Sequence, residues 1–295
     1  MKSRFLHGSL MLALAIFTAA PALAQHPGNS RFANGMRMPL APIPEKGEPV
    51  APFFEGWYAN PDGTFTFSFG YFNMNTEEII DLPIGPDNFI EPAEFDGVQP
   101  THFPSQPRRD RGIFHVTVPA SYADEEQRVV WTITANGVPL SVPARVGYEA
   151  LQLDYSAKAM GSVPPQVRFA PDGPIGEHIT GIWTEPRTAT VGTPLMLTVW
   201  GDEVSVRSPV DVVNTDVFLV VTWVKHQGPA GEVTFGPRRI KIEGGHGRAT
   251  TNVTFMEPGE YLLRAKVDNH KANDSSGGDQ CCWTNMYVPV TVTGG

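Results

Sequence analysis

The chain has 295 residues and a formal net charge of −9 at pH 7, from 22 Lys and Arg against 31 Asp and Glu. This acidic balance argues against nucleic acid as a partner, because binding to a phosphate backbone needs clustered cations. The 29 glycines and 28 prolines favour short strands joined by turns, and two cysteines are too few for a small disulfide-stapled scaffold.

The N-terminus has the pattern of a secretory signal peptide. Lys2 and Arg4 precede the apolar run LMLALAIFTAAPALAQ, and the tripeptide ALA at 22–24 fits the small-x-small cleavage rule. We expect a signal peptide over 1–24 and export of the remainder, which would be periplasmic or secreted. Because the run is shorter than a bilayer-spanning helix, no membrane insertion is expected after cleavage. Loss of Lys2 and Arg4 leaves 20 basic and 31 acidic residues, a formal net charge of −11.

An N-terminal β-sandwich is predicted over 53–146, after an extended arm over 25–52 that is rich in Pro, Gly and Met. The segment TFTFSFGYF has an aromatic ring at every second position, which is typical of a strand with one buried face. The segment VVWTITANGVPLSV predicts a hairpin, because Asn-Gly supplies left-handed turn positions. The predicted strands and hairpin of this domain occupy 64–72, 79–85, 112–119 and 129–142.

A second β-sandwich is predicted over 176–295, after a mixed and Pro-rich linker over 147–175. Its segments alternate apolar and polar residues, and no helical period competes with that pattern. The predicted strands occupy 188–203, 217–226, 248–255, 261–267 and 286–292. The fold class predicted for the whole chain is therefore all-β, with two β-sandwich domains.

The second domain resembles an immunoglobulin-like sandwich of the PKD or fibronectin type. The resemblance rests on Trp223 in the third strand and on EPGEYLLRA, in which Tyr261 matches a tyrosine corner. Antibody domains place a cysteine two residues after that tyrosine, whereas Leu263 stands there in this chain. The resemblance implies a fold without the intersheet disulfide. It implies little about function, since sandwiches host many functions.

The whole chain also resembles a group of exported bacterial proteins to which no activity is assigned. The stretches that carry the resemblance are GWYANPDGTFTFSFGYFNMN, LPIGPDN, PPQVRF and QCCWTN, at 56–75, 82–88, 164–169 and 280–285. The resemblance covers both domains. It implies no reaction, ligand or catalytic residue.

No sequence motif for catalysis is present: HExxH, GxSxG, a P-loop, CxxC and the dinucleotide fingerprint are all missing. We therefore predict no catalytic residue, while a pair that meets only in space, such as His102 with Asp96, stays open. The predicted function is a non-enzymatic binding or interaction module of the bacterial envelope, with a protein or a carbohydrate as its partner. One alternative is a metal-binding or redox-responsive periplasmic protein centred on Cys281, Cys282 and the loop over 268–280, and another is a hydrolase or enzyme-accessory protein.

The loops at one end of the second domain are rich in oxygen ligands of the kind that calcium takes. The candidate calcium or ligand residues are Asp202, Glu203, Asp268, Asn269, Asp274 and Asp279. The alternative is that these are solvated turns, because no EF-hand spacing is present. No other cofactor is predicted. In the first domain, Arg108, Arg109 and Arg111 form a cationic cluster that either binds an anion or pairs with nearby acids.

A candidate interaction face is predicted on the outer side of one sheet of the second domain. If Trp223 and Tyr261 point inward, the opposite side carries an unusually apolar set. That set is Phe218, Val220, Leu262, Trp283 and Tyr287. Exposed, these aromatics would suit a sugar ring or a protein partner. The alternative is burial against the first domain or the linker.

The vicinal cysteines Cys281 and Cys282 are the only two in the chain. In a regular strand their side chains would face opposite ways and could not bond each other. Export to an oxidising compartment nevertheless favours a disulfide, and GGDQ before them supplies a flexible backbone. A vicinal disulfide, two free thiols and a soft-metal site are the three alternatives.

Overall fold

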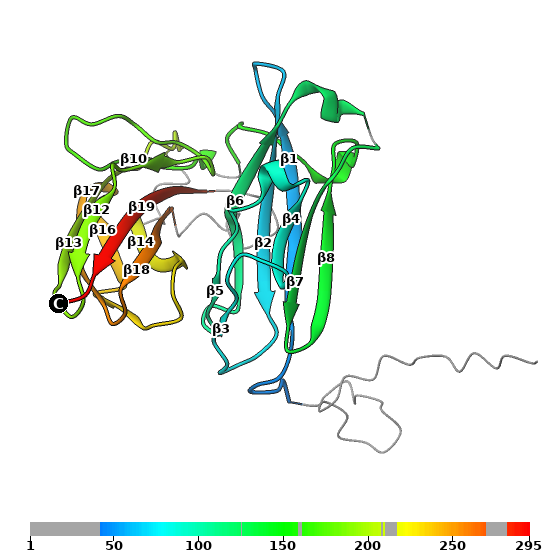
Figure 1. Ribbon diagram of the computed structural model, residues 1–295. Coiled ribbons are helices and arrows are strands. Elements are labelled where there is room, and N and C mark those ends of the chain that lie inside the picture. The colour runs from blue at the N-terminus through cyan, green and yellow to red at the C-terminus, as the bar shows by residue number, and fades with distance from the viewer. Residues whose placement is uncertain (1–41, 125, 159–160, 208, 210–216, 270–281) are drawn as a thin grey trace, which may run out of the picture. The chain divides into compact units, whose positions relative to one another are not determined.

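The computed structural model describes residues 42–124, 126–158, 161–207, 209, 217–269 and 282–295. All of them belong to one compact unit, Leu40–Gly295. Their regular elements are strands and three short 3-10 helices, arranged as two β-sandwiches (Figure 1). This confirms the all-β prediction. In the same described part, no helix has the length and apolar character needed to cross a membrane.

The first sandwich packs two main sheets, which have the strand orders β6-β2-β1-β9 and β4-β7-β8. The first sheet contains β1 (Val50–Ala59), β2 (Phe65–Asn73), β6 (Arg109–Val118) and β9 (Gln152–Leu153). The second contains β4 (Asn88–Glu91), β7 (Val129–Ala135) and β8 (Val138–Ala144). A short pair, β3 (Ile80–Asp81) and β5 (His102–Phe103), lies beside them, with the 3-10 helices η1 (Ala93–Phe95), η2 (Ala120–Ala123) and η3 (Glu149–Leu151).

Aromatic rings fill the core of the first sandwich, as the alternation in β2 predicts. Phe69 stacks on Phe114 with ring centroids 4.9 Å apart, and Trp131 packs edge-on against both rings. The predicted hairpin is also present, since β7 pairs with β8 and the turn between them has φ of 51° at Asn136 and 76° at Gly137. Only residues that tolerate a left-handed backbone suit those two positions.

Buried asparagines tie the loops of the first sandwich to its core. The side-chain NH2 of Asn88 donates to the carbonyls of Pro100 at 2.8 Å and Leu82 at 3.0 Å, while its oxygen accepts from Trp131 Nε1 at 3.0 Å. Asn73 and Asn75 make similar bonds to loop carbonyls. These three residues belong to the stretches GYFNMN and LPIGPDN. A buried amide must be hydrogen-bonded to offset its lost hydration, so these stretches have a structural role.

The second sandwich also has two sheets, with the orders β10-β13-β17-β15 and β11-β19-β18-β14-β16. The first contains β10 (Gln166–Arg168), β13 (Leu195–Asp202), β15 (Val233–Gly236) and β17 (His246–Phe255). The second contains β11 (Ile182–Trp183), β14 (Phe218–Gln227), β16 (Arg239–Glu243), β18 (Gly259–Asp268) and β19 (Trp283–Thr293). In addition, β12 (Arg187–Thr190) runs parallel to β19.

The second sandwich is immunoglobulin-like, and its core is closed by the predicted tyrosine corner. Trp223 is fully buried between the sheets, with Leu219 and Val221 beside it on the same face of β14. The Tyr261 hydroxyl donates to the carbonyl of Glu257 at 2.8 Å. This bond closes the turn before β18 onto the core, as in other sandwiches with this corner.

We expect Tyr261→Phe to lower the free energy of unfolding by about 1 kcal/mol, because it removes one hydrogen bond and keeps the buried ring. For a chain of this size the loss corresponds to a fall in Tm of roughly 2–4 °C. Thermal unfolding followed by circular dichroism measures it. An unchanged Tm would show that the corner bond contributes nothing to stability.

The structure adds regular elements to two segments that the sequence predicts as irregular. Strand β1 starts at Val50, inside the predicted arm. Within the predicted linker, β9 pairs with β1, whereas β10 pairs with β13 and buries Val167 in the second core. Strands as short as β9 and β10 show too little alternation to be recognised without their partners. Strand β1 is longer, but a register shift between Phe54 and Gly56 interrupts its alternation.

Candidate functional site

Directional hydrogen bonds join the two sandwiches. The Gln227 amide donates to the carbonyls of Gly97 at 2.8 Å and Gln99 at 2.7 Å. On the other side of the contact, the Asn285 amide donates to Gly112 O at 2.7 Å and the Tyr287 hydroxyl donates to Ile113 O at 3.2 Å. Each of these bonds supplies a hydrogen-bond donor to a backbone carbonyl at the boundary between the two sandwiches. A cavity between the sandwiches therefore has walls that are fixed by the fold.

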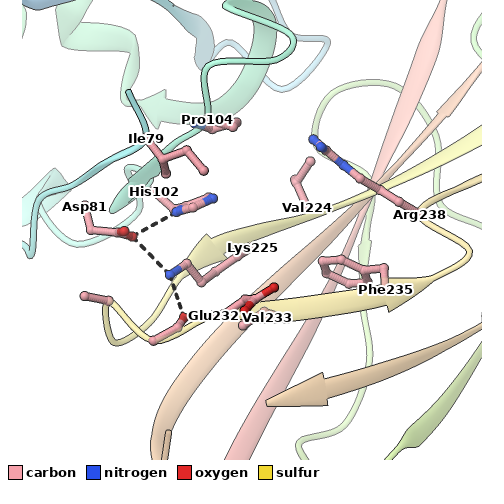
Figure 2. A pocket seen from close by; sticks show the side chains of 12 residues that line it. Ile79, Asp81, His102, Pro104, Val224, Lys225, Glu232, Val233, Phe235 and Arg238 are labelled. Carbon is pink, nitrogen blue, oxygen red and sulfur yellow. Dashed lines mark hydrogen bonds and ion pairs between the residues drawn. The ribbon is translucent and has the colours of Figure 1, made fainter. Parts of the chain in front are cut away.

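Such a cavity, of about 390 Å³, opens between β3 and β5 of the first sandwich and β14 and β15 of the second (Figure 2). Its apolar wall includes Ile79, Val224 and Phe235. Its charged and polar groups come from both sandwiches, and Figure 2 shows them around the same space. This size and this mixture are typical of sites for small ligands.

Lys225 connects the two sides of the cavity. Its side chain is only 3% exposed, and its ammonium group lies 3.0 Å from Asp81 Oδ1. It also donates to the carbonyls of Pro229 at 2.8 Å and Gly231 at 3.2 Å. An ammonium group has three N–H donors, and all three are used. Lys225 is therefore part of the scaffold of the cavity and has no donor left for a ligand.

Asp81 also orients a histidine. His102 Nδ1 lies 2.8 Å from Asp81 Oδ1, and the other ring nitrogen points away from Asp81, toward the cavity (Figure 2). Burial raises the pKa of Asp81, but the hydrogen bonds and charges of His102 and Lys225 outweigh it, so the pKa lies below its ordinary value. Asp81 is ionised at neutral pH. A pair of His102 with Asp96, which the sequence left open, is not formed, because His102 pairs with Asp81. Asp96 accepts from Ile90 N and Gln99 Nε2.

Arg238 and Glu232 supply the remaining charges of the cavity. Arg238 Nε donates to Trp223 O at 3.2 Å. This bond holds the guanidinium group in place through its Nε atom. Within the described residues, neither its terminal nitrogens nor the Glu232 carboxylate has an ion-pair partner. A guanidinium group anchored at Nε presents two parallel N–H donors, the geometry that binds a carboxylate.

A small inner chamber of about 10 Å³ lies behind the cavity and shares His102 and Lys225 with it. Its wall includes Tyr71, Asp110, His226 and Arg264. Asp110 forms an ion pair with Arg264 and lies 3.5 Å from Lys266 Nζ. Burial raises the pKa of Tyr71 far above its ordinary value. The chamber has the volume of about one water molecule.

Two β-bulges bring these polar groups together. In the pairing of β14 with β18, the register shifts between Lys225 and Gln227, so His226 is an extra residue. In the pairing of β2 with β6, a shift follows Phe69 and sets Tyr71 opposite Asp110. A bulge turns neighbouring side chains out of strict alternation. Lys225 and His226 are consequently both buried, although they are adjacent in a strand.

Acid is expected to destabilise this boundary through buried histidines. Burial, and then the charge of Arg264, lower the pKa of His226 to about 3, and burial lowers the pKa of His115 to about 4. An unfolded histidine has a pKa of about 6.5, so both residues gain protons on unfolding below that pH. The stabilisation is complete above pH 6.5 and is lost progressively as the pH falls toward the folded values. Each histidine contributes at most about 1.4 kcal/mol per pH unit.

Urea unfolding at pH 7 and pH 5 tests this expectation. We expect a lower free energy of unfolding at pH 5, and a smaller pH difference in His226→Gln, whose amide can still donate to Val98 O in place of Nε2. Equal pH dependence in the variant and the parent chain would contradict it.

The predicted calcium end is only partly within the described residues, because Asp274 and Asp279 lie outside them. Of the others, Asp202 forms an ion pair with Arg168, and Glu203 forms one with Arg207 at 3.3 Å. Asn269 donates to Glu203 Oε2, while Asp268 lies in β18 near this end. The described residues hold no group of three or more His, Cys, Asp or Glu side chains arranged for a metal ion. A calcium site remains an untested prediction.

All five residues of the candidate interaction face are buried in the structure. Phe218, Val220, Leu262, Trp283 and Tyr287 are each at most 9% exposed. Tyr287 contacts the first sandwich through its hydroxyl and stacks on Trp183, with ring centroids 4.6 Å apart. The face is apolar, as the sequence predicts, but its exposure is not observed. The alternative of burial within the chain describes it better.

The cysteine pair lies at the edge of the described residues. Cys282 is completely buried at the start of β19, and Cys281 lies outside the described residues. No free cysteine is present in the described part. Because Cys281 lies outside the described residues, the vicinal disulfide stays a prediction.

The arginine cluster of the first sandwich is engaged within the chain. Arg109 forms an ion pair with Glu55, and Arg108 lies over the ring of Phe72 at 4.9 Å. The Arg109 pair agrees with the alternative that the cluster pairs with nearby acids, whereas the contact of Arg108 is with an aromatic ring. The sequence patterns did not predict the cavity between the sandwiches. The one local signal was the polar pair Lys225-His226 at the end of an otherwise apolar strand.

Comparison with known proteins adds a fold likeness only. Neither a protein-family model nor a curated protein matches the chain. Among solved structures, the PapD-like domain 7 of human CEP192 has a TM-score of 0.29 and 10% identity, over 52% of this chain and 98% of that one. The D00-D0 domain of intimin has a TM-score of 0.25 and 10% identity, over 82% and 99%. WR4, an MSP family member of C. elegans, has a TM-score of 0.24 and 11% identity, over 36% and 92%. Likenesses this weak carry no argument about the site.

Proposed function

We propose that this chain is an exported, non-enzymatic binding module that takes a small, partly apolar carboxylate into the cavity between its sandwiches. The observation that carries the proposal is Arg238, whose anchored guanidinium group borders a partly apolar cavity without an ion-pair partner among the described residues. The N-terminal signal pattern supports the exported location.

Each part of the cavity has a place in this recognition. Arg238 would bind the carboxylate through two N–H groups, which is the geometry its side chain favours. The apolar body of the ligand would pack against Val224 and Phe235. The outer ring nitrogen of His102 would bond a polar group of the ligand, since Asp81 fixes the imidazole from the other side. Lys225 and Asp81 neutralise each other and join the two walls of the cavity.

A binding role is favoured over catalysis by what the cavity lacks. His102 oriented by Asp81 resembles the base half of a hydrolytic site. However, the described residues that line the cavity include no Ser, Thr or Cys that could act as a nucleophile. Lys225, the other candidate nucleophile, is held by three hydrogen bonds.

Isothermal titration calorimetry with a panel of aliphatic and aromatic monocarboxylates tests the proposal, with the matching neutral amides as ligand controls. We expect at least one carboxylate to bind more tightly than its amide, and Arg238→Gln to weaken that binding by about tenfold or more, the value of a charged hydrogen bond. Arg239→Gln, one residue away and outside the cavity lining, is the matched control and should leave Kd unchanged.

Two outcomes would reject the proposal. One is a panel in which no carboxylate binds better than its amide. The other is an equal loss of affinity in Arg238→Gln and Arg239→Gln, which would indicate a general effect of net charge.

A further inference from the structure

A second, open groove of about 500 Å³ lies beside the turn between β1 and β2, at the top of Figure 1. It shares no residue with the cavity between the sandwiches. Most of its lining residues carry a hydroxyl, amide or carboxylate group, and the rings of Tyr155 and His178 border it as well. The residues that supply these groups are Asn60, Asp62, Thr64, Thr66, Thr117 and Tyr155.

The ring of Tyr155 is fixed at this groove. It stacks on Tyr58 with ring centroids 4.6 Å apart and planes 18° apart, and its hydroxyl donates to Asn60 Oδ1 at 3.0 Å. The ring of His178 also packs against it in a T-shaped contact, with centroids 4.7 Å apart, so a ligand would meet the part of the Tyr155 ring that these two neighbours leave exposed. Tyr155 is nevertheless 36% exposed. A rigid aromatic side chain offers contact area to a ligand at little cost in conformational entropy.

The hydroxyl groups around Tyr155 are oriented by a chain of hydrogen bonds. The Asn60 amide donates to the hydroxyls of Thr64 and Thr66, both at 2.9 Å. Thr64 donates onward to Asp62 Oδ1 at 2.7 Å, and Thr66 shares a bond of 3.2 Å with the exposed Thr117. The lining is therefore ordered before any ligand arrives, which lowers the entropic cost of binding.

The turn on the other side of the groove is also rigid. His178 has a φ of 58°, a left-handed backbone that is uncommon for a residue with a side chain. Its carbonyl accepts from Asn285 N at 3.4 Å, and Gly181 lies so close to β19 that an added Cβ would be 1.7 Å from Asn285 O. This backbone is held by its packing on β19. Such conformations persist where the surroundings determine them.

The charge of the groove selects the class of ligand. Asp62 is fully exposed, and the hydroxyl and backbone N–H of Thr64 hold the pKa of Asp62 below its ordinary value. Burial lowers the pKa of His178, so the imidazole is neutral at neutral pH. The lining thus carries one negative charge and no cation among its described residues. The exposed carboxylate of Asp62 would repel an anionic polymer. An apolar ligand would cover this carboxylate and the exposed Thr117 hydroxyl without replacing their hydrogen bonds to water.

We propose that this groove binds a neutral saccharide, with one face of a sugar ring against Tyr155 and sugar hydroxyls bonded to Asp62 and Thr117. Sugar hydroxyls donate to the carboxylate and exchange hydrogen bonds with the threonine hydroxyls, while the C–H groups of the ring cover the aromatic surface. The groove gives the chain a binding activity beyond that of the cavity.

Calorimetric titration of the purified chain with cellohexaose, hexa-N-acetylchitohexaose and maltohexaose tests the proposal, with polygalacturonate as the anionic probe. We expect at least one neutral hexasaccharide to bind. Tyr155→Ala should weaken that binding about five- to tenfold through loss of the ring contact, and Asp62→Asn should weaken it about tenfold through loss of the charged acceptor. Arg238→Gln should not change it, which separates this groove from the cavity.

Matched threonine variants control for effects on folding. Thr117→Val removes a groove hydroxyl, whereas Thr198→Val removes an equivalent exposed hydroxyl that bonds Thr250 at 3.0 Å on the second sandwich. Only the first should weaken saccharide binding. The proposal is overturned if no neutral hexasaccharide binds, if polygalacturonate alone binds, or if Tyr155→Ala and Thr117→Val bind as tightly as Thr198→Val.

Discussion

Replacing Asp110 by Ala is expected to lower the free energy of unfolding by about 3–5 kcal/mol, the usual cost of leaving a buried partner charge alone. Arg264 is 2% exposed and would lose the carboxylate that neutralises it across the boundary between the sandwiches. Burial raises the pKa of Asp110, but the charges of Arg264 and Lys266 outweigh it and hold that pKa below its ordinary value. The carboxylate is therefore ionised at neutral pH, and its removal uncovers a full positive charge.

Urea unfolding measures this loss, and two further variants sharpen its meaning. Asp202→Ala removes the same group from the Arg168 pair, whose side chains are 25% and 26% exposed, and should cost about 1 kcal/mol or less. The double variant Asp110→Ala with Arg264→Met should be more stable than Asp110→Ala alone, because the buried charge of Arg264 is removed together with its partner. If Asp110→Ala costs no more than Asp202→Ala, the pair does not hold the sandwiches together.

Trp131→Ala is expected to be the most damaging change in the first sandwich, at about 3–5 kcal/mol for the loss of a buried tryptophan. Trp131 is fully buried, and its ring contacts Phe69, Phe103 and Phe114. Its Nε1 also donates to Asn88, which holds two loop carbonyls. The substitution would remove packing and loop anchoring together.

Trp183→Ala provides the matched control, because Trp183 is 53% exposed and makes one stacking contact, with Tyr287. Its cost should stay at about 1 kcal/mol or less. The loss of stability in Trp131→Phe should fall between the losses in Trp131→Ala and Trp183→Ala. This substitution keeps a ring but leaves the Asn88 oxygen without its donor. Comparable losses in Trp131→Ala and Trp183→Ala, measured by urea unfolding, would contradict this account of the core.

The two proposed sites differ in how far their parts are separated in the sequence. The groove at Tyr155 takes four of its residues from the single turn after β1, where Asn60 and Asp62 organise the threonines. The cavity takes Asp81 and His102 from one sandwich and Lys225 and Arg238 from the other. Only the groove at Tyr155 can be recognised in a short stretch of sequence, as a cluster of polar turn residues.

Local patterns in the sequence determined the regularly alternating strands such as β2 and β18, the hairpin at Asn136-Gly137 and the tyrosine corner at Tyr261. Each of these depends on interactions within a few residues or on strict alternation, so the chain itself encodes it. The sequence also encodes the apolar character of the face around Phe218 and Tyr287. It does not encode that this face is buried. Burial depends on which other segment packs there.

Only the tertiary structure decided where the charges lie. The β-bulge at His226 breaks the alternation that the sequence predicts and buries Lys225 beside it. The partners of these residues, Asp81 and Val98, come from more than 100 positions earlier in the chain. A bulge and a long-range ion pair arise from packing between the sandwiches. Such packing leaves no periodic pattern in the sequence, whereas a regular strand does.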